Sequence, residues 1–221
     1  MISVFFFCTR QSNLQEILNT YKKYDFINEI LIVHLDPISS TMEKITKKCK
    51  FIHMPKESDL GLLSRYTFAL SCKNRYVFIQ DDDWVYNEEF FNKVINTKQP
   101  IAGAHGRWFE NGKYIRKKDK SLNTAPIVLT TGVLVDTKFL PKVIEYAKDF
   151  WSEYQNVFNG EDIFMNIAIA KIADQKEFPI FTNKKYYTFL NTEGKELSKD
   201  VNSFKSRTNV TREIYNYFDV Y

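Results

Sequence analysis

The feature that most constrains the fold is a set of short apolar segments without polar alternation. Three of them are ISVFFFC (2–8), EILIVHL (29–35) and YVFIQ (76–80). A strand with one face in water alternates apolar and polar residues, whereas a strand of a parallel sheet covered by helices on both faces is apolar throughout. Segments with helical spacing separate these strands. The sequence therefore predicts a Rossmann-like α/β fold with a mostly parallel central sheet flanked by helices.

The remaining segments extend this pattern. We expect helices over residues 14–24, 59–72, 88–96, 137–148, 161–173 and 211–218, and a weak helix after Pro37. We expect further strands over 50–54, 127–135 and 179–183, with a small antiparallel hairpin around Asn111-Gly112. Ser12 or Asn13, Asp59 and Asn87 are typical helix N-caps. No repeat or linker divides the chain, so we predict a single domain, 1–221, and its abrupt end also fits one domain of a longer enzyme.

Composition excludes several classes of protein. With 44% hydrophobic and 16% aromatic residues, the chain is too apolar to be disordered, and its net charge of +4 is mild. Cys8, Cys49 and Cys72 form no CxxC motif, which favours free thiols in a reducing compartment. Because no apolar run approaches about 18 residues, we expect no transmembrane segment. We predict a soluble, cytoplasmic protein (in the host cytoplasm if viral) with no nucleic-acid partner.

Polar residues follow three of the predicted strands. They are Thr9-Arg10, Asp36 and the triplet Asp81-Asp82-Asp83. In open parallel sheets, ligands bind beyond the carboxyl ends of the strands. Adjacent carboxylates repel one another unless a cation compensates them, and hard oxygen ligands suit Mg²⁺ or Mn²⁺. The alternative is a solvated acidic turn in which Asp83 or Asn87 caps the next helix.

Two further features are candidates for the same site. Arg65 precedes Asp81 by sixteen residues on a predicted helix, where it faces either a nucleotide diphosphate or solvent. Glu161 and Asp162 open the predicted helix at 161–173. Acidic residues in a first turn complement the helix dipole, but they also suit acid/base chemistry or cation stabilisation in group transfer.

Taken together, these motifs resemble a known family. An apolar strand followed by Thr9-Arg10, a helix with Arg65, VFIQDDDWV (77–85) and NGEDIFMNIAIA (159–170) resemble nucleotide-sugar glycosyltransferases of the GT-A fold. The likeness is greatest to exostosin-like N-acetylhexosaminyltransferases and a similar chlorella-virus glycosyltransferase domain. It implies a metal-dependent enzyme that moves a sugar from a nucleotide-diphosphate sugar, a UDP-sugar, to a glycan or other hydroxyl acceptor with retention of configuration. Uridine comes from the resemblance, and guanosine stays open.

The resemblance implies roles at the acidic triplet. Asp83, together with Asp81, would ligate Mn²⁺ or Mg²⁺ between the donor's two phosphates. Asp81 and Asp82 would approach the ribose and the donor sugar. The other residues implied to surround the nucleotide are Thr9, Arg10, Asp36 and Arg65. At Asp36 this chain departs from its relatives, which tend to have Asn there.

It also implies roles further along the chain. Glu161 and Asp162 would face the donor sugar and the acceptor, with Asp162 as the catalytic carboxylate. A tail cation would meet the diphosphate: Arg207 fits its spacing, whereas Arg212 fits its sequence surroundings.

Two other functions compete with this interpretation. DDDWV also matches the D-x-D-x-V pattern of haloacid-dehalogenase-like phosphatases, with Asp81 as the nucleophile, although that motif normally ends the first strand and here three strands precede it. A non-catalytic carbohydrate-binding domain would leave both acidic clusters unexplained. Trp84 and Trp108 fit either sugar stacking or core packing, and His105 fits a turn or a substrate contact.

Overall fold

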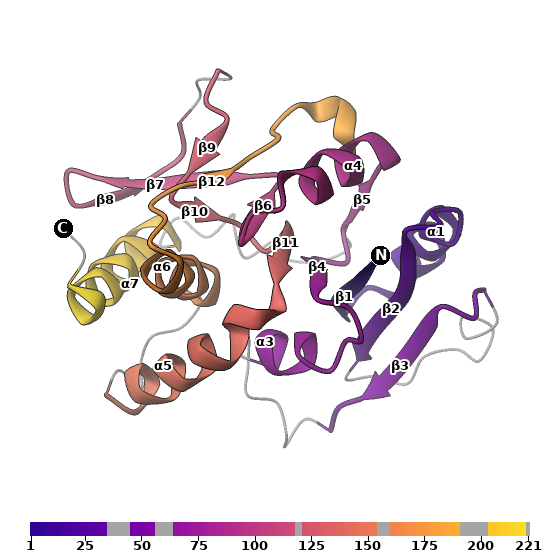
Figure 1. The fold of residues 1–221 in the computed structure, drawn as a ribbon, viewed down its shortest axis with the longest axis horizontal. Helices are drawn as coiled ribbons and strands as arrows, with labels where there is room; N and C mark the ends of the chain where they lie inside the picture. The colour runs from indigo at the N-terminus through magenta and orange to yellow at the C-terminus, as the bar shows by residue number, and fades with distance from the viewer. Residues whose placement is uncertain (35–44, 56–63, 118–120, 154–159, 191–202, 220–221) are drawn as a thin grey trace.

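The computed structural model describes residues 1–34, 45–55, 64–117, 121–153, 160–190 and 203–219, and a six-stranded sheet lies at its centre (Figure 1). In spatial order the strands are β3 (Cys49–His53), β2 (Ile27–His34), β1 (Ile2–Cys8), β4 (Tyr76–Gln80), β11 (Gly132–Asp136) and β6 (Ile101–Gly103). The first four are parallel to one another, and β11 is antiparallel to β4 and to β6. The predicted mostly parallel sheet is confirmed.

Helices cover both faces of this sheet, which explains why its strands are apolar throughout. Phe5 and Phe6, neighbours on β1, are both fully buried but belong to two different core clusters, one on each face. The cluster around Phe6 includes α1 (Gln11–Tyr21) and α4 (Glu88–Thr97). The cluster around Phe5 includes α3 (Ser64–Ala69), α5 (Leu140–Glu153), α6 (Glu161–Ala173) and α7 (Ser203–Phe218).

Small antiparallel sheets adjoin the central one. They are formed by β10 (Ile127–Val128), β7 (Gly106–Glu110) and β8 (Lys113–Ile115), by β12 (Phe178–Pro179) and β9 (Thr124–Ala125), and by β13 (Tyr187–Phe189) and β5 (Trp84–Tyr86). The predicted hairpin is the β7–β8 pair. Its turn residues Asn111 and Gly112 have φ values of 50° and 70°, a left-handed conformation that Asn and Gly adopt readily. Short 3₁₀ turns occupy Thr137–Phe139 and Lys184–Tyr186.

Several expected elements have different bounds in the structure, among them the strand expected at 179–183, where β12 covers only Phe178–Pro179. The segment 127–135 is not one strand: β10 joins the small sheet and β11 the central one, with a turn between them. At Gly132 a Cβ atom would lie 2.2 Å from the Tyr86 hydroxyl, so only glycine lets the chain enter β11 this close to β5. The final helix is longer than expected, because α7 begins at Ser203.

The helix caps agree with prediction only in part. The Asn87 side chain accepts a 3.0 Å hydrogen bond from the Phe90 N–H and caps α4, as predicted. The predicted cap of α1 at Ser12 or Asn13 is wrong, because α1 begins at Gln11 and the Asn13 amide instead donates to the Asp82 carbonyl. Asp36, the weak helix after Pro37 and the Asp59 cap lie outside the described residues.

Two predictions from composition can be compared with the structure. Cys8, Cys49 and Cys72 are free, as expected. Within the described ranges, none of the helices combines the length and the apolar character that crossing a membrane requires.

A buried carboxylate ties the parallel strands together at the edge opposite the acidic triplet. Glu29 on β2 is 1% exposed. It accepts hydrogen bonds from Ser3 Oγ at 2.5 Å, the Lys73 N–H at 2.7 Å and Lys50 Nζ at 2.8 Å. Burial would raise the pKa of Glu29, but these donors outweigh it and lower the pKa below its usual value.

This network predicts a pH-dependent contribution to stability. A lowered folded-state pKa means that the stabilisation is present above the unfolded value and is lost as the pH falls through the folded value. We therefore expect Glu29→Gln to lower the free energy of unfolding by about 1–3 kcal/mol at pH 7, with the difference shrinking toward pH 3. Denaturant titrations at both pH values measure this. Glu16→Gln, at an exposed position of α1, is the control and should change little; an equal loss at both pH values would contradict the prediction.

Candidate active site

The acidic triplet lies where β4 ends, beside the residues that follow β1. The Asp82 carboxylate points to the β1–α1 turn, where Oδ2 accepts hydrogen bonds from the backbone N–H groups of Thr9 and Arg10, each at 2.6 Å. The Thr9 hydroxyl donates to the same oxygen at 3.0 Å, and Arg10 Nη1 lies 2.5 Å from Oδ1. Both oxygens of Asp82 are thus engaged within the protein, and the carboxylate joins the ends of two central strands.

Asp83 is in a different position, because its charge is only weakly compensated. Its side chain is largely buried, Oδ2 lies 3.4 Å from Arg10 Nη1, and Oδ1 has no hydrogen-bond partner among the described residues. Burial, with Asp81 next and Asp82 adding to it, raises the pKa of Asp83 to about 6 although Arg10 opposes the shift. A buried carboxylate oxygen without a donor is destabilising unless a ligand or cation binds it.

Arg65 links the triplet to the second acidic pair. Arg65 Nη2 forms a 2.9 Å ion pair with Asp81, and Nη1 donates to the Thr130 hydroxyl at 3.0 Å. Burial opposes the charge of Arg65, yet attraction to Asp81 and to Glu161 raises its pKa. Its Nε is buried and has no partner in the described part of the chain. The structure thus places Arg65 between both clusters rather than in solvent.

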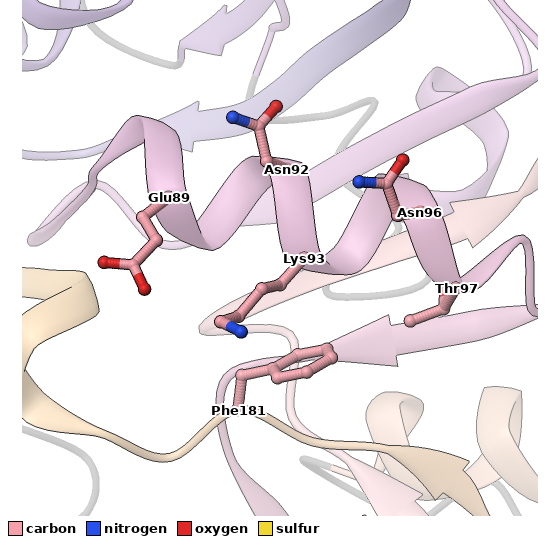
Figure 2. A pocket seen from close by; sticks show the side chains of 6 residues that line it. All are labelled: Glu89, Asn92, Lys93, Asn96, Thr97 and Phe181. Atoms are coloured by element: carbon pink, nitrogen blue, oxygen red, sulfur yellow. The ribbon is translucent and has the colours of Figure 1, made fainter.

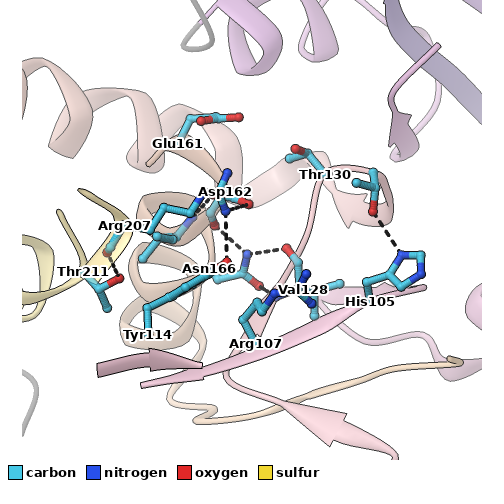
Figure 3. Close-up of polar contacts among 12 residues, drawn as sticks. His105, Arg107, Tyr114, Val128, Thr130, Glu161, Asp162, Asn166, Arg207 and Thr211 are labelled. Atoms are coloured by element: carbon cyan, nitrogen blue, oxygen red, sulfur yellow. Dashed lines mark hydrogen bonds and ion pairs between the residues drawn. The ribbon is translucent and has the colours of Figure 1, made fainter. Parts of the chain in front are cut away.

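Glu161 and Asp162 lie in the first turn of α6, and both are buried. Gly160 is the N-cap of this helix, and a Cβ atom there would lie 2.2 Å from Val210 Cγ1, so the absence of a side chain allows α7 to approach closely. Asn166, one turn later, accepts from the Val128 N–H at 2.9 Å and donates to the Val128 carbonyl at 2.8 Å. This fixes α6 against β10, and Figure 3 shows the resulting arrangement.

Arg207 compensates Asp162. Its Nη1 lies 3.0 Å from Asp162 Oδ2 and donates to the Tyr114 hydroxyl at 2.9 Å (Figure 3). Attraction to Asp162 raises the pKa of Arg207 above its usual value although burial opposes it. Asp162 Oδ1 accepts the Ile163 N–H at 2.9 Å, so both oxygens of Asp162 are held by donors.

Glu161 lacks such compensation. It is 4% exposed, and its Oε2 has no hydrogen-bond partner within the described ranges. Burial and repulsion from Asp162 raise the pKa of Glu161 to about 7, although Arg65 and Arg207 oppose the shift. A buried carboxylate whose pKa is raised to near neutrality is typical of sites that move protons.

The structure therefore brings together most of the residues predicted from the sequence. Those that share this region are Thr9, Arg10, Arg65, Asp81, Asp82, Asp83, Glu161, Asp162 and Arg207. Arg212 does not: it is exposed and its Nη2 contacts the Gly112 carbonyl at 3.4 Å, at the tip of the hairpin. The role of Asp36 cannot be compared with the structure, because it lies outside the described residues.

Sequence reasoning missed Arg107. This arginine on β7 is half-buried, and burial lowers its pKa with help from Arg116 while Tyr114 and Asp162 oppose the shift. Its position near Asp162 depends on the pairing of β7 with β10, which no local pattern reveals. The only signal was a cation within an otherwise apolar stretch.

The aromatic candidates form a cluster next to Asp83. The Trp84 ring lies 5.2 Å from that of His105 and 5.0 Å from that of Tyr187, between their centroids. His105 Nδ1 lies 3.2 Å from the Thr131 hydroxyl, and burial lowers the pKa of His105 to about 4, so the ring is neutral at pH 7. Trp108 is buried. The rings of Trp84, His105 and Tyr187 therefore pack against one another, whereas Trp108 belongs to the other core cluster. Packing of this kind agrees with the structural alternative for both tryptophans and for His105.

A separate hollow of about 490 Å³ lies on the outer side of α4 (Figure 2). It is lined by Glu89, Asn92, Lys93, Asn96, Thr97 and Phe181. None of the predicted site residues lines it, so it is not part of the candidate active site.

The residues present fit a divalent cation that takes its remaining ligands from the substrate and from water. Within the described ranges, no group of three or more His, Cys, Asp or Glu side chains could bind a metal alone. Mg²⁺ and Mn²⁺ need only one or two carboxylates when phosphate oxygens and water supply the other ligands. The unpartnered Oδ1 of Asp83 has the chemistry of such a ligand.

These features define a class of protein: a GT-A glycosyltransferase domain, in which a mostly parallel sheet presents an acidic strand end to a second carboxylate pair on a helix. Residues 2–221 match the glycosyl transferase family 64 domain, so the chain belongs to this family. Membership decides against the phosphatase and the non-catalytic alternatives. None of the curated proteins compared with the chain matches it in sequence.

Solved structures share the fold at low sequence identity. S. aureus TarS 1–349 in complex with UDP-GlcNAc has a TM-score of 0.59 and 17% identity over 98% of this chain and 66% of that chain. GalNAc-T7 with UDP, GalNAc and Mn²⁺ has a TM-score of 0.64 and 11% identity over 99% of this chain and 50% of that chain. The chain thus spans about two thirds of the first and half of the second. A 4-diphosphocytidyl-2C-methyl-D-erythritol synthase from Anaerococcus prevotii has a TM-score of 0.56 and 13% identity, with 87% and 91% covered.

The raised pKa of Glu161 gives a stability prediction with the opposite sign to that for Glu29. A folded-state pKa of about 7, above the usual 4.5, means that the protein loses stability as the pH rises through this window. We expect Glu161→Gln to gain roughly 1–2 kcal/mol over the unsubstituted protein between pH 5 and pH 8. Thermal melts at both pH values, without ligand, measure this difference. Glu16→Gln serves again as the control, and a difference that does not grow with pH would argue against a strained carboxylate.

Proposed function

We propose that this domain is a metal-dependent glycosyltransferase that moves a sugar from a UDP-sugar to a glycan or other hydroxyl acceptor with retention of anomeric configuration. The observation that carries the proposal is the set of buried polar atoms without partners among the described residues: Asp83 Oδ1, Glu161 Oε2 and Arg65 Nε. These three atoms are on residues grouped around the ion pair of Arg65 with Asp81. A ligand that carries hydroxyl groups and a cation-bound phosphate would supply the partners that they lack.

The nucleotide would bind at the ends of β1 and β4. Asp82 fixes the conformation of the turn at Thr9 and Arg10. These two residues would flank the uracil and ribose. Arg65 and Asp81 would contact the donor from the other side, and Asp36 stays a predicted nucleotide contact. Asp83, with Asp81, would hold Mn²⁺ or Mg²⁺, which when bound stabilises the negative charge of the diphosphate as a Lewis acid.

The sugar would lie between the triplet and α6. In the reaction, the bond between the sugar C1 and the phosphate oxygen breaks with its electron pair going to the diphosphate. The acceptor hydroxyl oxygen bonds to C1 and loses its proton. Asp162, held beside Arg207, would stabilise the positive charge that develops at C1. Glu161, with a pKa of about 7, is the carboxylate that takes up the proton near neutral pH.

The solved structures support the choice of donor and metal. TarS was solved with UDP-GlcNAc, and GalNAc-T7 with UDP and Mn²⁺. Both have the same fold as this chain, so we choose UDP with Mn²⁺ as the first ligands to test. Binding of a guanosine nucleotide in its place would change the donor but leave the reaction class unchanged.

The metal role of Asp83 gives the central test. We expect the protein to bind UDP with micromolar affinity only when Mn²⁺ is present, and Asp83→Asn to weaken this binding at least about 100-fold, since it removes a charged ligand. Calorimetric titration with UDP, with and without Mn²⁺, measures both. Asp174→Asn, at the exposed C-cap of α6, is the control for loss of one negative charge. Unchanged UDP affinity in Asp83→Asn would remove the metal role.

A matched pair of variants tests the tail cation. Arg207 and Arg212 are on the same helix, but only Arg207 contacts Asp162. We expect Arg207→Lys to lower kcat/KM for donor hydrolysis or transfer roughly 100-fold, because the lysine ammonium does not reproduce the position and planar geometry of the guanidinium, whose Nη1 contacts both Asp162 and Tyr114. Arg212→Lys should stay within about twofold of the unsubstituted enzyme. Equal effects of the two substitutions would contradict the assignment.

A further inference from the structure

The backbone of the acidic turn is held by uncharged donors that no role described above requires. The Gln80 side-chain amide spans the triplet: its Nε2 donates to the Asp81 carbonyl at 3.1 Å and to the Trp84 carbonyl at 2.9 Å. Gln80 is 1% exposed although it is polar. A buried amide whose two hydrogens bracket a turn fixes the path of the chain between its two acceptors.

The two carbonyls between these acceptors are satisfied in the same way. The Asp82 carbonyl accepts from Asn13 Nδ2 at 3.1 Å, and the Asp83 carbonyl accepts from the Leu190 N–H at 2.8 Å. Every carbonyl from Asp81 to Trp84 is therefore hydrogen-bonded to a neutral group. We call the side-chain amides of Gln80 and Asn13 the carbonyl clamp.

Tyr21 sets the orientation of the clamp. Its hydroxyl donates to Gln80 Oε1 at 2.6 Å and accepts from the Tyr86 N–H at 3.1 Å. Tyr21 and Tyr86 are both fully buried. Because Oε1 is occupied by this donor, the NH₂ group of Gln80 must face the carbonyls of the turn. One phenol on α1 thus connects the strand before the triplet to the strand after it.

The donors to the backbone of the turn are electrically neutral, and this matters as much as their geometry. Three adjacent carboxylates repel one another, and without restraint the turn would relax toward conformations that separate them. Cationic donors would restrain it but would also neutralise the charge that attracts a metal. Amide, phenol and backbone donors restrain the backbone without adding to the positive charge that Arg10 and Arg65 already bring to Asp82 and Asp81.

We infer that Gln80 and Tyr21 are positioning residues for the metal-binding carboxylates, acting through the backbone of residues 81–84. This inference rests on the proposed function, since it concerns the site at Asp83 and Asp81. It goes beyond that function because neither side chain would touch substrate or metal. Partners that orient metal ligands typically change metal affinity 10–100-fold when they are removed.

The test compares Gln80→Met, which keeps the length of the side chain and removes both donors, with Ile17→Val. Ile17 is fully buried on α1, the helix of Tyr21, and lies outside the clamp, so its substitution controls for a modest loss of stability. Two quantities are measured: deuterium uptake by the amides of residues 81–86 without ligand, and the Mn²⁺ concentration that gives half-maximal UDP binding.

We expect Gln80→Met to exchange faster at 81–86 and to need roughly 10-fold more Mn²⁺. Tyr21→Phe should shift both quantities in the same direction but less, and it serves alone if Gln80→Met does not fold. Ile17→Val should leave both quantities near those of the unsubstituted protein. Unchanged exchange and an unchanged Mn²⁺ requirement in both Gln80→Met and Tyr21→Phe would overturn the inference. If the unsubstituted protein shows no Mn²⁺-dependent UDP binding, the proposed function fails, while the exchange rates still decide whether the clamp orders the turn.

Discussion

The Asp82 carboxylate is the interaction on which the site depends. It accepts four hydrogen bonds from Thr9 and Arg10, and so joins the end of β1 to the end of β4 across the parallel sheet. Charge-assisted bonds of this kind are stronger than neutral ones, and here they are largely screened from water. Asp82 has its hydrogen-bond donors within the protein, whereas Asp81 pairs with Arg65 and Asp83 keeps one oxygen without a partner among the described residues.

The acidic residues of the site thus differ in how far the protein compensates them. Asp82 and Asp162 have close donors and cations, whereas Asp83 and Glu161 each keep a buried oxygen without a partner among the described residues. Burial raises the pKa of both of the latter, to about 6 and about 7. Stability lost in this way is typical of functional sites, where a ligand restores what folding leaves unsatisfied. Arg65 lies between the acidic triplet and the pair Glu161 and Asp162, and its positive charge reduces the repulsion among these carboxylates.

Sequence reasoning succeeded where one local pattern has one physical cause. Non-alternating strands such as ISVFFFC predicted a sheet covered on both faces, and the cap at Asn87 and the turn at Asn111-Gly112 followed from side-chain chemistry. It failed where contacts between residues far apart in the sequence decided the local structure. The cap expected at Ser12 or Asn13 is absent because α1 begins earlier, at Gln11, and the Asn13 amide donates to the carbonyl of Asp82, some seventy residues away. The strand expected at 127–135 is broken because β10 pairs with β7 in the small sheet, whereas β11 pairs with β4 and β6 in the central sheet.

The sequence by itself determined the α/β class, the order of the elements and the residue types of the site, because periodicity and strand-end composition are local properties of the chain. Only the tertiary structure decided where each of those residues lies and which partner it has. It separated Arg207 from Arg212, added Arg107, and showed which carboxylates are compensated. The reason is physical: a side chain's charge state and orientation depend on burial and on partners from other strands and helices, and these contacts exist only after the chain has folded.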